Sequence, residues 1–149
     1  MASVVYNEFK RASAAGEVDL DTGGDDIRVA LLMTNTTADT ENDAIVTVAN
    51  FTTLDEMDGS GYTSPGIALT NEAVNKDDTN DRAEFDADDV TWSSLGNGTR
   101  AVQGVLLYKF VTNLNSSLPI AFIEFSSNQN PGGSDFTVQW DAEGILQLS

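Results

Sequence analysis

Short apolar runs recur along most of this chain, and clusters of Asp, Asn, Gly, Ser and Thr separate them. Runs of about five residues rich in Val, Ile, Phe and Tyr, spaced roughly 8–12 residues apart, are typical of β-sandwiches and β-barrels. The clearest predicted strands cover residues 27–33, 105–111, 120–125, 136–140 and 145–148. Weaker strands are predicted at residues 66–70, 72–76, 82–86 and 90–93. We therefore predict an all-β fold, either a β-sandwich or a jelly-roll-like barrel, whose strand order stays open.

The periodicity within these runs indicates how deeply each strand is buried. Residues 136–140 alternate cleanly between apolar and polar side chains, as expected for a strand with one buried face. Residues 27–33 are apolar on both faces except at Arg28, and residues 105–111 are nearly as apolar. These two runs therefore predict the most buried strands of the fold.

One segment near the N-terminus is predicted to be helical. In residues 6–15, Phe9 and Ala12 follow Val5 at helical spacing, and Gly16 provides a stop. Such a helix has only two to three turns, so it needs to pack against the rest of the protein.

The length predicts one β-sandwich domain over residues 1–149, with residues 1–16 as an N-terminal helix or arm. Deletion of residues 1–12 is expected to leave the sandwich folded. The long polar stretch at residues 34–64 is expected to leave one end of the sandwich, and loops of that length are often functional. Within it, residues 44–51 form either a strand or a loop that inserts side chains into the core.

The charge balance excludes several classes of partner. The chain has 24 acidic and 7 basic residues, which give a net charge of −17. Such a surface repels phosphate backbones and anionic membranes, so we expect neither nucleic acid nor membrane as a partner. The same composition suits concentrated salt, where ions screen the repulsion, and it equally suits an ordinary protein kept in solution by its charge.

The chain lacks histidine and cysteine, which removes the commonest general base, the thiolate nucleophile and the usual zinc ligands. No run approaches about 18 uninterrupted apolar residues, so no transmembrane helix is expected. Composition therefore predicts a protein that is not an enzyme and that carries no cofactor.

Two acidic features of the sequence are candidate sites. Asp77, Asp78 and Asp81 belong to a dense acidic run that would suit Ca²⁺, but the spacing of a helix–loop–helix calcium site is missing. A solvated turn is the favoured interpretation, and no metal site is predicted. Glu124 is the one acid inside an apolar run, but glycosidase chemistry needs a second, facing acid. We expect Glu124 to point outward or to pair with Arg28 or Lys109.

Several segments taken together resemble small virion structural proteins of tailed phages and of related tailed viruses of archaea. The resemblance rests on YNEFK (6–10), DDIRVALL (25–32), GYTSPGIALT (61–70), FDADDVTW (85–92), VLLYK (105–109), PIAFIEF (119–125) and GGSDFTVQWD (132–141). These segments occur in the same order over nearly the whole chain.

The resemblance implies a capsid decoration, or cement, protein with a compact β-sandwich or jelly-roll fold. Such a protein would be made in the host cytoplasm and would sit on the capsid exterior of the virion. Its expected partners are the major capsid protein and further copies of itself, as a homotrimer. The alternatives are a tail, neck or fibre-attachment component, or a carbohydrate-binding β-sandwich with Tyr62, Trp92 or Trp140 as the stacking platform.

A docking face on such an acidic protein should be poorer in acid than the average surface. Residues 4–15 and 91–118 meet this criterion, whereas residues 34–61 and 77–89 are expected to face solvent. The candidate interface residues in the two acid-poor segments are Lys10, Arg11, Arg100, Tyr108 and Lys109.

Overall fold

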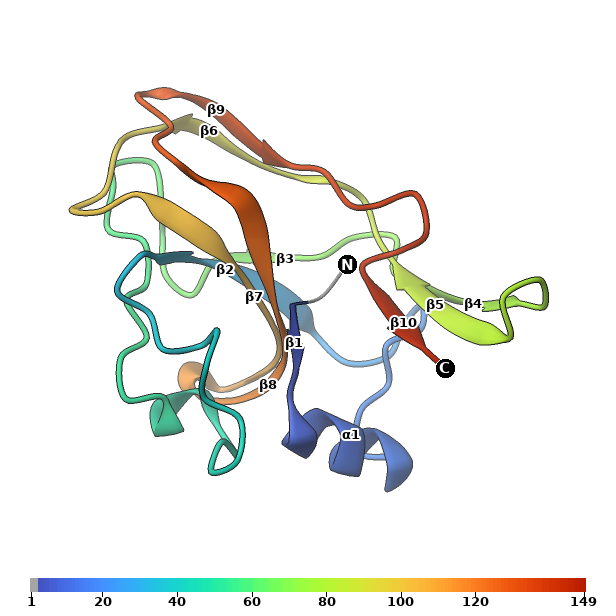
Figure 1. The fold of residues 1–149 in the computed structure, drawn as a ribbon. Helices are drawn as coiled ribbons and strands as arrows, with labels where there is room; N and C mark the ends of the chain where they lie inside the picture. Colours follow the sequence, from blue (N-terminus) through green and yellow to red (C-terminus); the bar gives the residue numbers. More distant parts are fainter. Residues whose placement is uncertain (1–2) are drawn as a thin grey trace.

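The computed structural model describes residues 3–149 and places most of the regular structure in β-strands (Figure 1). Its strands are β1 (Val4–Val5), β2 (Ile27–Met33), β3 (Ile67–Ala68), β4 (Ala73–Asp77), β5 (Arg82–Asp86), β6 (Val90–Leu95), β7 (Val102–Val111), β8 (Asn113–Gln129), β9 (Ser134–Val138) and β10 (Leu146–Leu148). A single α-helix, α1 (Asn7–Ala14), and a 3₁₀ turn, η1 (Val48–Asn50), complete the described part of the chain. The predicted all-β class with a short N-terminal helix is therefore confirmed.

The strands form three antiparallel sheets. The largest has the order β1-β8-β7-β2-β3, and the two smaller sheets have the orders β10-β5-β4 and β6-β9. The long hairpin of β7 and β8 forms the centre of the large sheet, and β2 pairs with the other edge of β7. In Figure 1, the β6–β9 sheet lies across the top of this hairpin, and the β10-β5-β4 sheet lies to one side.

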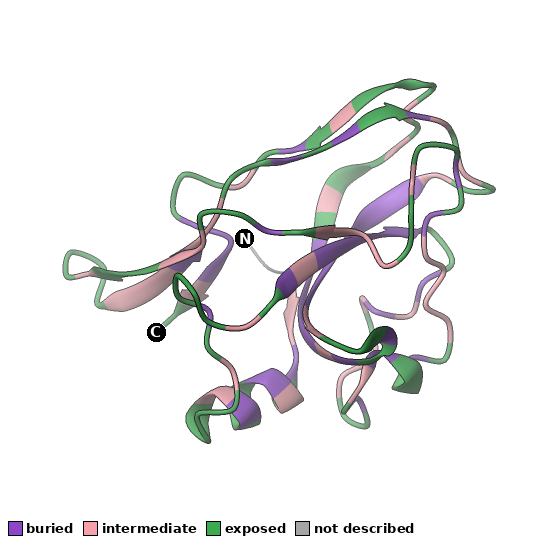
Figure 2. Ribbon diagram, turned by 180° about the vertical axis from the view of Figure 1, so that it is seen from behind, coloured by how far each residue is buried: buried purple, intermediate pink, exposed green. Residues whose placement is uncertain are grey.

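The large sheet is covered on both faces, which explains why β2 and β7 are apolar at nearly every position. Val29 and Leu107 are paired across the two strands and point into one hydrophobic core, together with Leu31. Their neighbours Ala30 and Leu106 are also paired, but they point into a second core on the opposite face. Figure 2 shows the buried residues concentrated along these central strands.

The two smaller sheets cover the first face in the manner of a β-sandwich. Phe85 of β5, Trp92 of β6, Val138 of β9 and Leu146 of β10 belong to the same buried cluster as Leu107 of the large sheet. The sandwich-like packing therefore brings together strands from the whole length of the chain.

The loop of residues 34–64 covers the second face. Ala38, Ile45, Val48 and Phe51 are all buried there against the large sheet. The expectation that residues 34–61 face solvent is therefore wrong at these four positions, because their side chains form one wall of the second core. Residues 44–51 take the second of the two predicted forms, a loop with inserted side chains.

The N-terminal segment is built into the domain. Val4 of β1 pairs with Phe122 of β8, and Tyr6, Phe9 and Ala12 are fully buried. The expectation that residues 1–12 could be removed without unfolding is wrong, because the deletion would remove three core side chains. Met1 and Ala2 lie outside the described residues.

Helix α1 ends where its sequence predicts. The amide of Gly16 donates to the carbonyl of Ser13 at 3.1 Å, and the amide of Glu17 donates to the carbonyl of Ala12 at 2.8 Å. This pair of bonds is the Schellman motif, which satisfies carbonyl groups at the helix end and turns the chain toward β2.

Candidate docking surface

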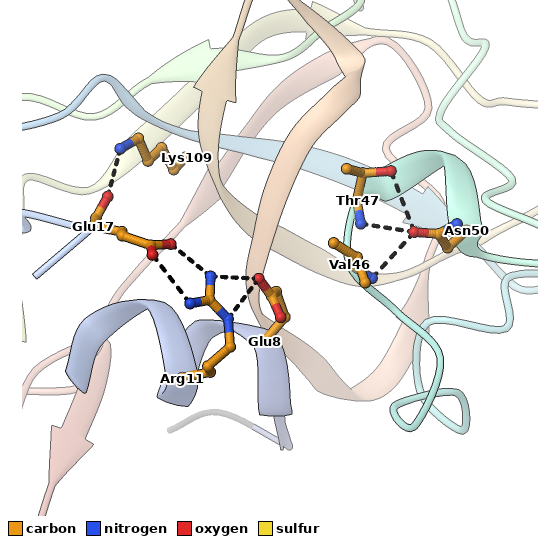
Figure 3. Close-up of polar contacts among 7 residues, drawn as sticks. All are labelled: Glu8, Arg11, Glu17, Val46, Thr47, Asn50 and Lys109. Atoms are coloured by element: carbon orange, nitrogen blue, oxygen red, sulfur yellow. Dashed lines mark hydrogen bonds and ion pairs between the residues drawn. The ribbon is translucent and has the colours of Figure 1, made fainter. Parts of the chain in front are cut away.

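Three of the four predicted interface cations, Arg11, Lys109 and Arg100, form ion pairs with carboxylates of the same chain. The first two lie close together. Arg11 bridges Glu8 at 2.8 Å and Glu17 at 2.5 Å, which lowers the pKa of Glu17 (Figure 3). Lys109 lies 2.9 Å from a carboxylate oxygen of Asp25 and donates to the carbonyl of Glu17 at 2.6 Å. Both cations are therefore drawn to Glu17, which links α1 to the end of β7.

The remaining predicted interface residues lie apart from this cluster. Arg100 pairs with Asp55 at 2.8 Å, beside the opposite end of β7 from Lys109. Lys10 is exposed on α1 and has no carboxylate within ion-pair distance among residues 3–149. Tyr108 is 0% exposed and its hydroxyl donates to the carbonyl of Pro65, so its prediction as a surface contact residue is wrong. Its side chain points into the second core with Leu106.

The acids considered for calcium are engaged in local contacts. Asp77 accepts hydrogen bonds from Asn80 and Thr79, and the bond from the Asn80 side chain is the main reason that its pKa is lowered. Asp78 lies 2.9 Å from Lys76, and Asp81 occupies the turn between β4 and β5. Among the described residues, no three acidic side chains are grouped so that they could hold a metal ion. This region has the contacts of a hydrogen-bonded turn.

Glu124 is exposed, and its carboxylate accepts a hydrogen bond of 3.2 Å from the side chain of Gln103. Of the two expected arrangements, Glu124 takes the outward one and does not pair with Arg28 or Lys109, because those cations pair with Asp26 and Asp25, respectively. Each of these two cations therefore already has a carboxylate partner in the loop that precedes β2.

The aromatic side chains predicted as a carbohydrate platform do not form an exposed surface on which a sugar ring could stack. Trp92 is 3% exposed, and Tyr62 stacks on it with ring centroids 6.2 Å apart. Trp140 is half-buried, and its indole N–H donates to the carbonyl of Asp88 at 2.9 Å. This arrangement disfavours a stacking site for sugars on Trp92.

The acidic residues are strongly segregated in the fold. Only Glu124 and Asp135 of the 24 acidic residues lie between Val90 and Trp140, and Arg100 and Lys109 balance them. This stretch builds β6, β7, β8 and β9, so the excess negative charge lies in the remainder of the chain.

The neutral surface consists of exposed, uncharged side chains on β6, on the end of β8, and on β9 together with the residue that follows it; the exposed Asp135 of β9 is not one of its members. Its members are Thr91, Ser93, Ser126, Ser127, Thr137 and Gln139. The strands that carry them lie in the upper part of Figure 1. Residues 91–118 predicted only part of this surface, since most of β7 is buried. The acid-free stretch at residues 125–134 also indicates this surface in the sequence, and the predicted segments did not include it.

A groove of about 240 Å³ runs along the neutral surface between β8 and β9. It is lined by Phe125, Ser126, Gln129, Phe136, Thr137, Val138 and Gln139. The rings of Phe125 and Phe136 lie 6.0 Å apart, and both side chains are half-buried. No residue that lines the groove carries a charge.

The edge of β9 beside this groove has no strand partner among the described residues, since β9 pairs only with β6. The far edge of β6 is shielded, because Gly96 donates to the carbonyl of Ser60 at 2.7 Å. A β-carbon on Gly61 would also lie only 3.0 Å from the carbonyl oxygen of Ser94, so that loop runs close along β6. The open edge of this small sheet is therefore on β9.

Comparisons with protein-family models, curated proteins and solved structures found no match to this chain. In the described part of the chain, no helix has both the length and the apolar character needed to cross a bilayer.

Proposed function

We propose that this protein is a structural docking domain of a virion, and specifically a head decoration protein that binds an assembled capsid shell. The observation that carries the proposal is the neutral surface on a chain of net charge −17. The resemblance of the sequence segments to virion structural proteins supplies the particular partner, the major capsid protein.

Docking by such a protein requires a contact face on which its own charge does not oppose the approach. Like charges that face each other across an interface cost binding energy and slow the encounter. The neutral surface removes this penalty where β6, β9 and the end of β8 lie together. The acidic remainder of the molecule would face solvent and keep decorated particles from adhering to one another.

The sandwich-like fold suits a mechanical role. Both faces of the large sheet are packed, and the cores take side chains from the N-terminal segment to β10. A contact made by a rigid domain loses little conformational entropy on binding. On a symmetric shell, the modest contacts made by many copies would then sum to a strong overall attachment.

The proposal is tested by the copy number of this protein relative to the major capsid protein in purified particles. Hundreds of copies per particle would support a decoration protein, whereas about six or twelve would place it in the tail or neck. Absence from purified particles would contradict both virion roles.

A matched pair of variants tests the part played by the neutral surface. Ser126→Asp adds a carboxylate beside the groove, whereas Thr79→Asp adds one to the exposed turn between β4 and β5. We expect only Ser126→Asp to lower the occupancy of particles that lack the wild-type protein. Equal occupancy by both variants would contradict docking through this surface.

A further inference from the structure

The edge of β9 lacks the features by which proteins prevent edge strands from pairing with other chains. Natural edge strands are protected by lysine, proline, bulges or a covering loop. Strand β9 has the sequence Ser-Asp-Phe-Thr-Val and contains neither lysine nor proline. Its one charged residue, Asp135, accepts a hydrogen bond of 2.9 Å from the amide of Ser94. The free edge therefore presents backbone groups beside side chains that are uncharged except for Asp135.

The charge pattern indicates what covers this edge. A strongly basic partner would be attracted to acidic surfaces and would gain little from a face whose only acid on β9 is Asp135. A face poor in acidic residues favours binding to a partner that is neutral or itself acidic. A second copy of this chain, with its net charge of −17, is such a partner.

We infer that two copies of this protein associate by antiparallel pairing of their β9 strands about a twofold axis. Pairing centred on Phe136 places Ser134 opposite Val138 and Asp135 opposite Thr137 of the other copy, so no two acids face each other. The result is one four-stranded sheet in which each β6–β9 pair contributes half. The added strand would lie along the groove and cover the half-buried rings of Phe125 and Phe136.

This inference rests on the same neutral surface as the proposed function, but its test uses free protein in solution, so either can fail without the other. It is tested by sedimentation equilibrium of the full chain in about 2 M NaCl, where repulsion between the copies is screened. We expect a concentration-dependent increase to the mass of two copies. A mass of one copy at every concentration, or of three copies, would overturn the twofold pairing.

Variants at Thr137 test the register of the pairing. Thr137→Asp would place a carboxylate opposite Asp135 of the second copy, twice in each dimer. In about 0.15 M NaCl, where such a pair is less screened than in about 2 M NaCl, this variant should weaken association about tenfold or more. Thr137→Lys would place an ammonium group there and should strengthen it.

Thr91 provides the matched control for both variants. Its hydroxyl lies 2.7 Å from that of Thr137, on the neighbouring strand and away from the free edge. Thr91→Asp and Thr91→Lys therefore lose the same hydrogen bond and change the net charge equally. Similar melting temperatures for the two Asp variants would establish that both are folded. Equal association by Thr137→Asp and Thr91→Asp would contradict the pairing, even if the protein proved to decorate capsids.

Discussion

The hydroxyl of Tyr6 donates a hydrogen bond of 2.6 Å to the carbonyl oxygen of Ala38, and both residues are fully buried. This bond joins the residue that precedes α1 to the loop of residues 34–64. Burial raises the pKa of the Tyr6 hydroxyl, so it stays protonated and remains a donor at any ordinary pH. The N-terminal segment and the loop therefore support each other over the second core.

Tyr6→Phe is expected to lower the free energy of unfolding by about 1–2 kcal/mol, because the buried carbonyl of Ala38 would lose its donor. Urea unfolding monitored by tryptophan fluorescence provides the measurement. Val46→Ala, at a position 55% exposed on the same loop, should change stability little. Equal losses in the two variants would argue against a specific role for the Tyr6 hydroxyl.

Gly66→Ala is expected to destabilise the protein more than Gly133→Ala. Both residues have positive φ, +98° and +87°, so both variants carry backbone strain. A β-carbon on Gly66 would also collide with the carbonyl oxygen of Val29 in β2, whereas one on Gly133 meets no atom within 4 Å. We expect a difference of about 1–3 kcal/mol in the free energy of unfolding, measured by chemical denaturation. Identical stabilities would contradict the close approach of Gly66 to β2.

The carboxylate of Glu41 connects two parts of the loop that covers the second core. Hydrogen bonds from the side chain and amide of Thr52, and from the hydroxyl of Thr37, lower its pKa below the ordinary value of 4.5. A lowered pKa in the folded state means that the carboxylate stabilises the fold above its unfolded pKa. That contribution is lost as the pH falls through the folded-state pKa.

Glu41→Gln should therefore have a lower urea midpoint than wild type at pH 7, and the difference should shrink as the pH falls below about 4. Asp43→Asn, at an exposed position on the same loop, supplies the control for the loss of one negative charge. A difference between Glu41→Gln and wild type that persists unchanged well below this pH would show that the ionised form of Glu41 contributes nothing.

Added salt is expected to stabilise the protein, because 24 acidic residues repel one another more strongly in the compact state than in the unfolded chain. Raising NaCl from about 0.1 M to about 2 M should increase the melting temperature by several degrees. Replacing the exposed Asp43 and Asp78 with lysine should reduce this increase. A melting temperature that is independent of salt would mean that the surface charge carries no folding penalty.

Local pattern was sufficient for much of the secondary structure. Strands β2 and β5 have the predicted bounds, because segments rich in Asp or Thr flank both of them. Strand β8 extends well beyond the predicted residues 120–125, since its Ser- and Asn-rich ends still pair with β7. Side-chain pattern does not report that pairing, which is made by the backbone.

The candidate site was only partly predictable, because it depends on contacts between distant segments. The neutral surface arises when β6 pairs with β9, which lies more than 40 residues further along the chain, as for Thr91 and Thr137. The prediction for Tyr108 failed because charge content along a segment does not tell that β7 lies in a sheet covered on both faces. Tyr108 and Leu106 point into the second core, and Leu107 between them points into the first.

The loop of residues 34–64 has a practical consequence for anyone who modifies this protein. Since Ile45, Val48 and Phe51 close one side of the second core, an epitope grafted into that loop would compete with folding. The β4–β5 turn at residues 78–81, exposed at every position, is the better place to display a foreign peptide.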